Sequence, residues 1–235
     1  MKFAIDLHIH SCLSPCADES MTPNNIVNMA SLKELDFIAI TDHNSAENCE
    51  ACMRCGMEKN IVVIPGMEIE SVEEVHLVTL FKSLKGVLIM QNYVYSNMKD
   101  MENREDIFGE QIIMDENDEI IGKNKKMLIA ATNLSLDDVF NKTTEIGGVC
   151  IPAHVDRSSN SFISNLGFIP DYLNVKYIEL SKKCDNESFL SKNSYLKKYR
   201  SYNSSDAHRL GDILEREVFL DLKERSIEKF FLKLT

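Results

Sequence analysis

Short apolar runs rich in β-branched residues recur along the chain, and helical patterns separate most of them. Such alternation is typical of βα units, in which a strand and a crossover helix lead to the next parallel strand. The length of 235 residues suits one undivided α/β barrel. We therefore expect strands at residues 2–7, 37–41, 61–65, 76–81, 149–152, 177–180, 202–205 and 218–222.

Several of the predicted helices have recognisable starts. Thr22 stands before a proline, and a capping hydroxyl followed by proline is a favoured helix N-terminus. Ser135 precedes an aspartate by three positions, a capping pattern, and a glycine pair further on predicts where that helix ends. Asn44 or Ser45 is expected to begin a helix that runs to about Gly56.

Imidazole and carboxylate side chains collect where the apolar runs end. Because the carboxyl ends of parallel barrel strands face one mouth of the fold, we expect these side chains to meet there. His8 and His10 stand two apart on an extended segment, so both point to one face, as a metal chelate requires. His76 is an exception, since it opens its run. The remaining members are Asp42, His43, Glu68, His154, Asp206 and His208.

Residues 99–127 interrupt this pattern with a charged segment. Within it, residues 109–122 (GEQIIMDENDEIIG) predict a β-hairpin that turns at residues 115–118. We interpret the segment as an insertion. It is either a solvated decoration or a lid over the site.

The formal net charge of −11 bears on the choice of partner. Proteins that bind the DNA or RNA backbone without specificity normally carry basic patches, and this sequence predicts no basic groove. We therefore expect no long nucleic acid as a partner, although nucleotides and short oligonucleotides are compatible. Bound divalent ions would make one pocket locally positive, so a phosphate-bearing substrate is not excluded.

The seven cysteines are odd in number and the chain start lacks a signal-peptide pattern, which predicts reduced thiols and a cytoplasmic location. No stretch approaches the ~20 apolar residues of a membrane span, so no membrane partner is expected. Cys49, Cys52 and Cys55 have a spacing known from iron–sulfur proteins, but no fourth cysteine lies nearby. We favour their packing as small apolar groups on a helix. The oligomeric state stays open.

Six motifs contain most of the residues singled out above, and they follow one another between residues 6 and 212. They are DLHIHS, ITDHN, PGMEIE, EVHLV, PAHVDR and SDAHRLGD. In this order they resemble the successive motifs of the PHP (polymerase and histidinol phosphatase) superfamily. The resemblance implies an α/β fold, a distorted (β/α)7 barrel, here as a single domain over residues 1–235 with the hairpin insertion at about 99–127.

The same resemblance implies an activity and its cofactors. We expect metal-dependent hydrolysis of phosphoesters, with a small phosphorylated substrate and two or three divalent ions (Mn, Fe or Zn). A metal-bridged hydroxide would attack phosphorus in line. The implied ligands of the first ion are His8, His10, Glu68 and Asp206. Glu68 would bridge to a second ion held also by His76 and His154, and a third ion would be held by His43 and His208.

Cys16 is a departure from the family pattern, since several three-metal members carry a histidine at this position. A thiolate is a good ligand for zinc or ferrous iron and a poor one for magnesium or manganese. We expect Cys16 to complete the third ion site. Asp18 or water is the alternative.

Two arginines next to predicted ligands are candidates for substrate binding. Guanidinium matches phosphate oxygens bidentately, so we expect Arg157 and Arg209 to hold the substrate phosphate. The alternative is an ion pair with one of the many acidic residues. We count Arg157, Asp206 and His208 as the catalytic residues.

Carboxylates beside the ligands are expected to support the reaction. Asp6 and Asp42 are predicted to orient imidazoles rather than to bind an ion. If all six histidines hold ions, none is free to act as a general acid. Stabilisation of the leaving group would then come from an ion, from its bound water, or from a carboxylic acid such as Asp156.

Two other functions are compatible with the sequence. An amidohydrolase-type enzyme would also place a histidine pair after its first strand, and Lys82 could serve as its carbamylated lysine. Against this function stand Glu68 after the third run and the Asp206–His208 pair. A non-catalytic metal-binding PHP domain is the other alternative, although such a remnant should have lost more ligands.

Overall fold

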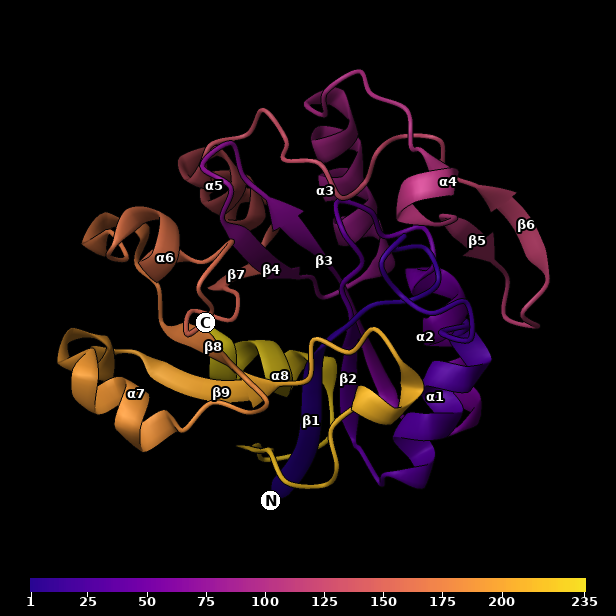
Figure 1. Cartoon of the computed structure of the whole chain (residues 1–235). Helices are drawn as coiled ribbons and strands as arrows, with labels where there is room; N and C mark the ends of the chain where they lie inside the picture. The colour runs from indigo at the N-terminus through magenta and orange to yellow at the C-terminus, as the bar shows by residue number, and fades with distance from the viewer.

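The computed structural model describes residues 1–235 and contains a mixed α/β fold built around a curled sheet (Figure 1). Six strands form one sheet in the order β10-β1-β2-β3-β4-β7. Their bounds are β1 (Lys2–Ile9), β2 (Phe37–Ile40), β3 (Val62–Glu70), β4 (His76–Leu80), β7 (Val149–Pro152) and β10 (Phe219–Asp221). A parallel pair, β8 (Tyr177–Ser181) and β9 (Arg200–Ser204), lies beside it. All eight predicted runs are strands.

Short backbone contacts join the pair β8–β9 to the larger sheet on both sides. Ile9, at the end of β1, forms a parallel bridge with Ala207, just beyond β9. The Val155 amide, just beyond β7, donates to the carbonyl of Glu179 in β8 at 2.9 Å. Strands β1, β2, β3, β4, β7, β8 and β9 therefore curve into the expected distorted seven-stranded barrel, and β10 pairs antiparallel with the outer edge of β1.

The direction of β4 differs from the expectation of parallel strands. β4 is antiparallel to both of its neighbours, β3 and β7. Only residues 71–75 connect β3 to β4, and a connection this short joins antiparallel strands because a parallel crossover needs a dozen or more residues. His76 at the start of β4 therefore lies at the same end of the barrel as the carboxyl ends of the other strands.

The helices cover the sheet and connect its strands (Figure 1). Their bounds are α1 (Pro23–Leu32), α2 (Cys49–Glu58), α3 (Leu84–Ser96), α4 (Glu105–Phe108), α5 (Leu136–Ile146), α6 (Phe162–Leu166), α7 (Asn186–Lys192) and α8 (Ile227–Leu234). Short 3-10 turns occur at η1 (Asp171–Leu173), η2 (Ser194–Lys198) and η3 (Leu210–Asp212).

Helix starts follow the capping signals in two of the three predicted cases. The Thr22 side chain caps α1, and Ser135 caps α5 through a reciprocal capping box. Helix α2 begins at Cys49, later than predicted. Asn44 instead has a left-handed backbone with a φ of 50°, and its side-chain amide donates to the Leu128 carbonyl at 2.7 Å. Asn44 therefore does not cap a helix; it fixes the loop around residues 128–130.

The core consists mainly of two hydrophobic clusters. The larger includes buried side chains of α1, α2, α3 and α5 that pack on the sheet, such as Ile26 and Val87. The smaller contains strand residues and the aromatic face of α8, where Phe230 stacks on Phe37 with ring centroids 5.5 Å apart. With sheet and helices packed in this way, the strand ends are held rigidly enough to present side chains.

The predicted hairpin is present as β5 (Ile112–Met114) and β6 (Ile120–Lys123). It packs beside the loop that follows β1: the Ile112 amide donates to the Cys12 carbonyl at 3.0 Å. Buried Asn48 joins the hairpin to the same loop, donating to the Ser11 hydroxyl at 2.9 Å and accepting from the Met114 amide at 3.0 Å. The hairpin therefore supports a loop near the site.

Candidate metal centre

All six histidines and two of the acidic residues meet at one end of the barrel. They come from six strands, and each is placed by its position at or near a strand end. The residues are His8 in β1, His10 just after β1, His43 after β2, Glu68 in β3, His76 at the start of β4, His154 after β7, and Asp206 and His208 after β9.

The ligand set expected for the first ion is assembled as one group. The donor atoms of His8, His10, Glu68 and Asp206 lie within 4.8 Å of one another. His8 Nε2 is 3.1 Å from His10 Nε2 and 3.3 Å from Asp206 Oδ1. Four donor atoms that converge in this way suit the coordination of one divalent ion.

The second group differs in one member from the expected set. His43, Glu68 and His76 share donor atoms within 4.8 Å, whereas the prediction joined Glu68 and His76 to His154. His154 is nevertheless close, since its Nε2 lies 3.1 Å from Glu68 Oε1. Its ring centroid is 5.2 Å from that of His76.

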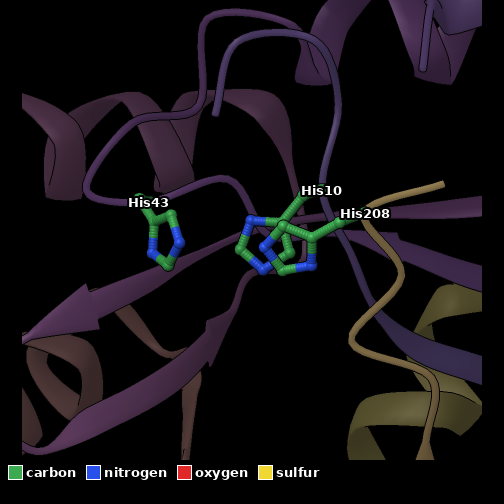
Figure 2. Close-up of side chains that lie close together, drawn as sticks. All are labelled: His10, His43 and His208. Carbon is green, nitrogen blue, oxygen red and sulfur yellow. The ribbon is translucent and has the colours of Figure 1, made fainter. Parts of the chain in front are cut away.

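The third group contains His10, His43 and His208, again within 4.8 Å (Figure 2). The rings of His10 and His208 stack with centroids 4.2 Å apart, and His43 lies beside them. His10 thus belongs to both the first and the third group. The three groups share residues, so ions bound in them would be close neighbours.

Glu68 is the carboxylate that links the groups. Its Oε1 lies 2.8 Å from His76 Nδ1 and its Oε2 lies 3.0 Å from His43 Nδ1. Burial would raise the pKa of this carboxyl, but the charges of His76, His8 and His43 outweigh it and hold the pKa well below the usual range. Glu68 is therefore an anion in the interior, where it needs compensating cations.

Opposite shifts of the histidine pKa values reflect the crowding of these rings. Burial lowers the pKa of His8, but Glu179, Glu68 and Asp206 raise it well above its ordinary value. In contrast, burial together with His208 and His43 holds the pKa of His10 well below its ordinary value. A neutral His10 is in the form that binds a metal ion.

Cys16 lies beside the third group, although its sulfur is not among the converging donor atoms. Cys16 is solvent-exposed, so the partial desolvation of its thiol raises the pKa only to an extent that hydrogen bonds with His208 and His43 outweigh, and they lower the pKa to about 6. Asp18, the alternative ligand, instead accepts from the Ser20 amide at 2.9 Å.

The loop after β1 orients two of the imidazoles through a serine. Ser14 Oγ is 3.0 Å from His10 Nδ1, accepts from the His43 amide at 3.1 Å and donates to Asp42 Oδ1 at 2.7 Å. Asp42 also accepts from the Ser11 amide at 2.7 Å. The expected support of an imidazole by Asp42 therefore acts through Ser14 and not by direct contact.

Asp6 supports the centre in a different way from the prediction. It contacts no imidazole, and accepts from the amides of Ser205 at 3.1 Å and Leu214 at 2.9 Å. Burial raises its pKa to about 6. Asp6 therefore fixes the loop that carries Asp206 and His208.

Arg157 and Asp156 are engaged within the protein, whereas Arg209 is exposed. Arg157, with 44% of its side chain exposed, pairs with Asp206 Oδ2 at 2.6 Å. Arg209 is exposed and lies next to His208 in the chain. Asp156 accepts from the Ser181 amide at 2.8 Å, so it joins the ends of β7 and β8.

Sequence reasoning gave no role to Glu179, which lies inside β8 and is 1% exposed. Its Oε1 is 2.9 Å from His8 Nδ1 and accepts from the His154 amide at 3.2 Å. A charged residue in the middle of the apolar run YIEL was the available signal.

The donor atoms fit a cluster of divalent ions. Imidazole nitrogens, carboxylate oxygens and a thiol are ligands that zinc, iron or manganese accept. His154 Nδ1 and Asp206 Oδ1 are buried without a hydrogen-bond partner. The ring nitrogens of His8 and His10 face each other at 3.1 Å, a contact that an ion between them would stabilise.

Other candidate features lie away from this centre. Cys49, Cys52 and Cys55 are buried in α2, and burial raises the pKa of each thiol, which supports the packing interpretation. Lys82 is exposed and lies 5.9 Å from the ring centroid of Phe231. A cavity of about 700 Å³ beside the starts of β7 and β8 contains no predicted ligand. None of the helices combines the length and apolarity that a membrane span requires.

The family model described as PHP domain matches residues 6–183. The chain therefore belongs to the PHP family. No curated protein matches it in sequence.

Solved structures of three relatives share the fold. A lesion-specific endonuclease Q from Pyrococcus furiosus has 18% identity and a TM-score of 0.72; the alignment covers 100% of this chain and 56% of that one. A candidate metal-dependent phosphoesterase from Bifidobacterium adolescentis has 18% identity, a TM-score of 0.62 and 92% coverage of both chains. An amidohydrolase from Chromobacterium violaceum, with bound sulfate, has 16% identity, a TM-score of 0.63 and coverages of 97% and 96%.

One comparison corrects the expected choice of partner. Endonuclease Q has been solved with a 27-mer duplex that carries an abasic lesion at its active site; it is 17% identical, has a TM-score of 0.73, and the alignment covers 98% of this chain and 56% of that one. The expectation that no long nucleic acid is a partner is therefore wrong. Net charge averages over the whole surface, whereas a metal site can attract phosphate locally.

The relatives with solved structures carry the names of hydrolases: an endonuclease, a candidate metal-dependent phosphoesterase and an amidohydrolase. The chain is accordingly assigned to that class. This chain spans 56% of the length of endonuclease Q. The activity of endonuclease Q as a whole is therefore not assigned to this chain.

Proposed function

We propose that this chain hydrolyses phosphoester bonds with two or three divalent ions, manganese, iron or zinc, bound by the side chains that converge at the barrel mouth. The observation that supports this proposal best is the position of Glu68. Its two oxygens lie between 2.8 and 3.4 Å from nitrogens of five histidines. An anionic carboxylate surrounded by imidazoles can bind one ion through each oxygen, and it then bridges the ions of a multinuclear metal site.

Divalent ions at such a site lower the pKa of water, orient the phosphate and neutralise charge on its oxygens. The residues of the chain would keep this arrangement fixed. His8, His10, Glu68 and Asp206 form the first site, and His43, His76 and His154 surround the other side of Glu68. Because every histidine is occupied, no imidazole is left as a general acid.

Arg157 is the proposed phosphate clamp. Its pairing with Asp206 at 2.6 Å keeps the guanidinium at the edge of the centre, and 44% exposure leaves its other nitrogens available to a substrate oxygen. An ion pair with an acidic residue was the alternative role expected for Arg157 from the sequence, and the pair with Asp206 is such a contact. Arg209, which is exposed next to His208, is a weaker candidate for the same task.

Cys16 is the proposed additional ligand of the third site. The lowered pKa of about 6 means that the thiolate form predominates at neutral pH. A thiolate beside His43 and His208 would favour zinc or ferrous iron over manganese. The substitution Cys16→Ser should reduce the bound metal by up to one ion per chain, and an unchanged metal content would count against this ligand.

DNA is included among the proposed substrates because a related fold holds duplex DNA at its active site. The metal-stripped protein should be reloaded with manganese, iron or zinc and assayed on p-nitrophenyl phosphate, on bis-p-nitrophenyl phosphate and on duplex DNA with one abasic site. An intact duplex is the matched control. Phosphoester hydrolysis that needs reloading and is lost in Glu68→Gln is the expected result; hydrolysis without metal would contradict the proposal.

Amide hydrolysis is the second candidate, because an amidohydrolase shares the fold over nearly the whole chain. The exposed position of Lys82 offers no carbamylated lysine at the centre. A panel of amides in the same assay separates the two activities. Turnover of amides alone would replace the phosphoesterase assignment.

A further inference from the structure

Glu179 is a buried carboxylate in β8 that takes no part in the predicted metal sites. Its side chain is 1% exposed, and it is the only charged residue in the strand YIELS. Burying a charge costs several kcal/mol unless charged or strongly polar groups compensate it. The partners of Glu179 therefore indicate what the residue does.

One oxygen of Glu179 contacts ligands of two different ion sites. Oε1 lies 2.9 Å from His8 Nδ1 and accepts a hydrogen bond from the backbone amide of His154 at 3.2 Å. His8 belongs to the first group of donor atoms, and His154 approaches Glu68 on the side of the second group. The Val155 amide also donates to the Glu179 carbonyl at 2.9 Å. Backbone and side chain thus both tie Glu179 to the loop after β7.

The contact with His8 determines which ring nitrogen can bind an ion. A carboxylate only accepts hydrogen bonds, so the proton of a neutral His8 lies on Nδ1. The lone pair of Nε2 then points toward Asp206 Oδ1 at 3.3 Å and Glu68 Oε1 at 3.4 Å. This carboxylate–histidine contact orients the ring and raises its basicity as a ligand.

The contact with His154 holds a strained backbone. His154 has a φ of +28°, a value that a residue with a side chain rarely adopts. The hydrogen bond from its amide to Glu179 stabilises this conformation, which keeps His154 Nε2 3.1 Å from Glu68 Oε1.

We propose that Glu179 is a positioning residue that couples the first two ion sites, because a single oxygen fixes the ring of His8 and the backbone of His154. This inference rests on the metal centre of the proposed function. It predicts that one substitution at a residue that binds no ion weakens both sites together.

The test compares metal binding in Glu179→Gln and Glu179→Met with that in Tyr202→Phe. Tyr202 faces Glu179 across the β8–β9 register, and its hydroxyl is buried without a hydrogen-bond partner. The control therefore removes a polar group from the same layer that has no hydrogen bond to either histidine. Zinc affinity is measured by competition with a chelator, and bound zinc is counted by mass spectrometry after dialysis.

Both Glu179 variants should bind zinc about 10–100-fold more weakly and should lose up to two ions. The Tyr202→Phe protein should retain wild-type affinity. At saturating zinc, the Nδ1 proton of His8, assigned by the loss of its ¹⁵N-attached signal in His8→Asn, should exchange slowly with solvent in the wild type and faster in Glu179→Met, where its acceptor is missing. Circular dichroism checks that each variant folds, and Glu179→Gln serves if the methionine variant does not.

The possible failures are distinguishable. If the wild type binds no zinc, the proposed function and this inference both fall. If the wild type binds zinc and Glu179→Gln binds it equally well, only the role of Glu179 is refuted. An equal loss in Tyr202→Phe would also refute it, because the effect would then come from packing in the layer.

Discussion

Replacing Glu68 by glutamine tests the centre at its most connected residue. The substitution keeps the volume of the side chain, removes its charge and turns one oxygen into a hydrogen-bond donor. Oε1 lies 2.8 Å from His76 Nδ1 and 3.1 Å from His154 Nε2, and Oε2 lies 3.0 Å from His43 Nδ1. Any ions held between these groups lose their only shared anion. We expect both of the ions that Glu68 bridges to be lost.

The expected effect on stability follows from mass action. An ion that binds only the folded state stabilises it by about 2.7 kcal/mol when its free concentration is about 100 times its Kd. Two such ions contribute about 5 kcal/mol. In a protein of this size about 1 kcal/mol shifts the Tm by about 2–4 °C. Metal should therefore raise the Tm of the wild type by about 10–20 °C, and that of Glu68→Gln by much less.

Thermal melts of chelated and metal-loaded samples measure this difference, and elemental analysis counts the ions. Glu145→Gln is the matched control, because Glu145 is 69% exposed and pairs only with Lys142 at the surface. It should show the full rise. The reasoning is refuted if Glu68→Gln shows the same rise as the wild type.

Three further measurements address single features. Burial lowers the pKa of His76, but Glu68 outweighs it and raises the pKa from 6.5 to about 9. The protonated His76 contributes fully to the stability of the metal-free protein below about pH 6.5, and this contribution is lost as the pH rises through about 9. The Tm should therefore fall across this window, and less steeply in His76→Gln. Parallel profiles of Tm against pH in the two proteins would contradict this. Cys16 in metal-stripped protein should react with iodoacetamide with a midpoint near pH 6 and be protected by metal; a midpoint near 9 would be the wrong result. Asn48→Ala should cost about 2–4 kcal/mol in urea unfolding of the metal-free protein, because it leaves buried groups of the hairpin and the β1 loop unpaired; a loss below about 1 kcal/mol would argue against the bracing role.

Much of the fold was predictable because local pattern and tertiary position agree. Each apolar run is a strand, and the capping signals at Thr22 and Ser135 begin helices. The direction of β4 was missed, since the composition of a run says nothing about its direction. The signal lay in the connection: residues 71–75 are too few for a crossover helix.

The candidate site was predictable where residues sit at strand ends and unpredictable where loops decide the contacts. The histidines meet because each lies at or near a strand end at the same mouth of the barrel. The pairing of Arg157 with Asp206, and the action of Asp42 through Ser14, depend on loop conformations that no spacing encodes. Glu179 was missed because its strand was interpreted as core, although the charged residue within the run YIEL was a signal.

The antiparallel turn between β3 and β4 has a consequence for how this protein can change. Glu68 and His76 are eight positions apart, and a pleat alternates sides at every residue. Adding or deleting one residue in 71–75 would turn the His76 ring to the far side of its strand and dismantle the centre without altering any donor. The segment 99–127, by contrast, carries none of the proposed ligands, so a change in its length would loosen its support of the loop after β1 without reversing the direction of a ligand. Chain length in these two places should therefore vary under different rules.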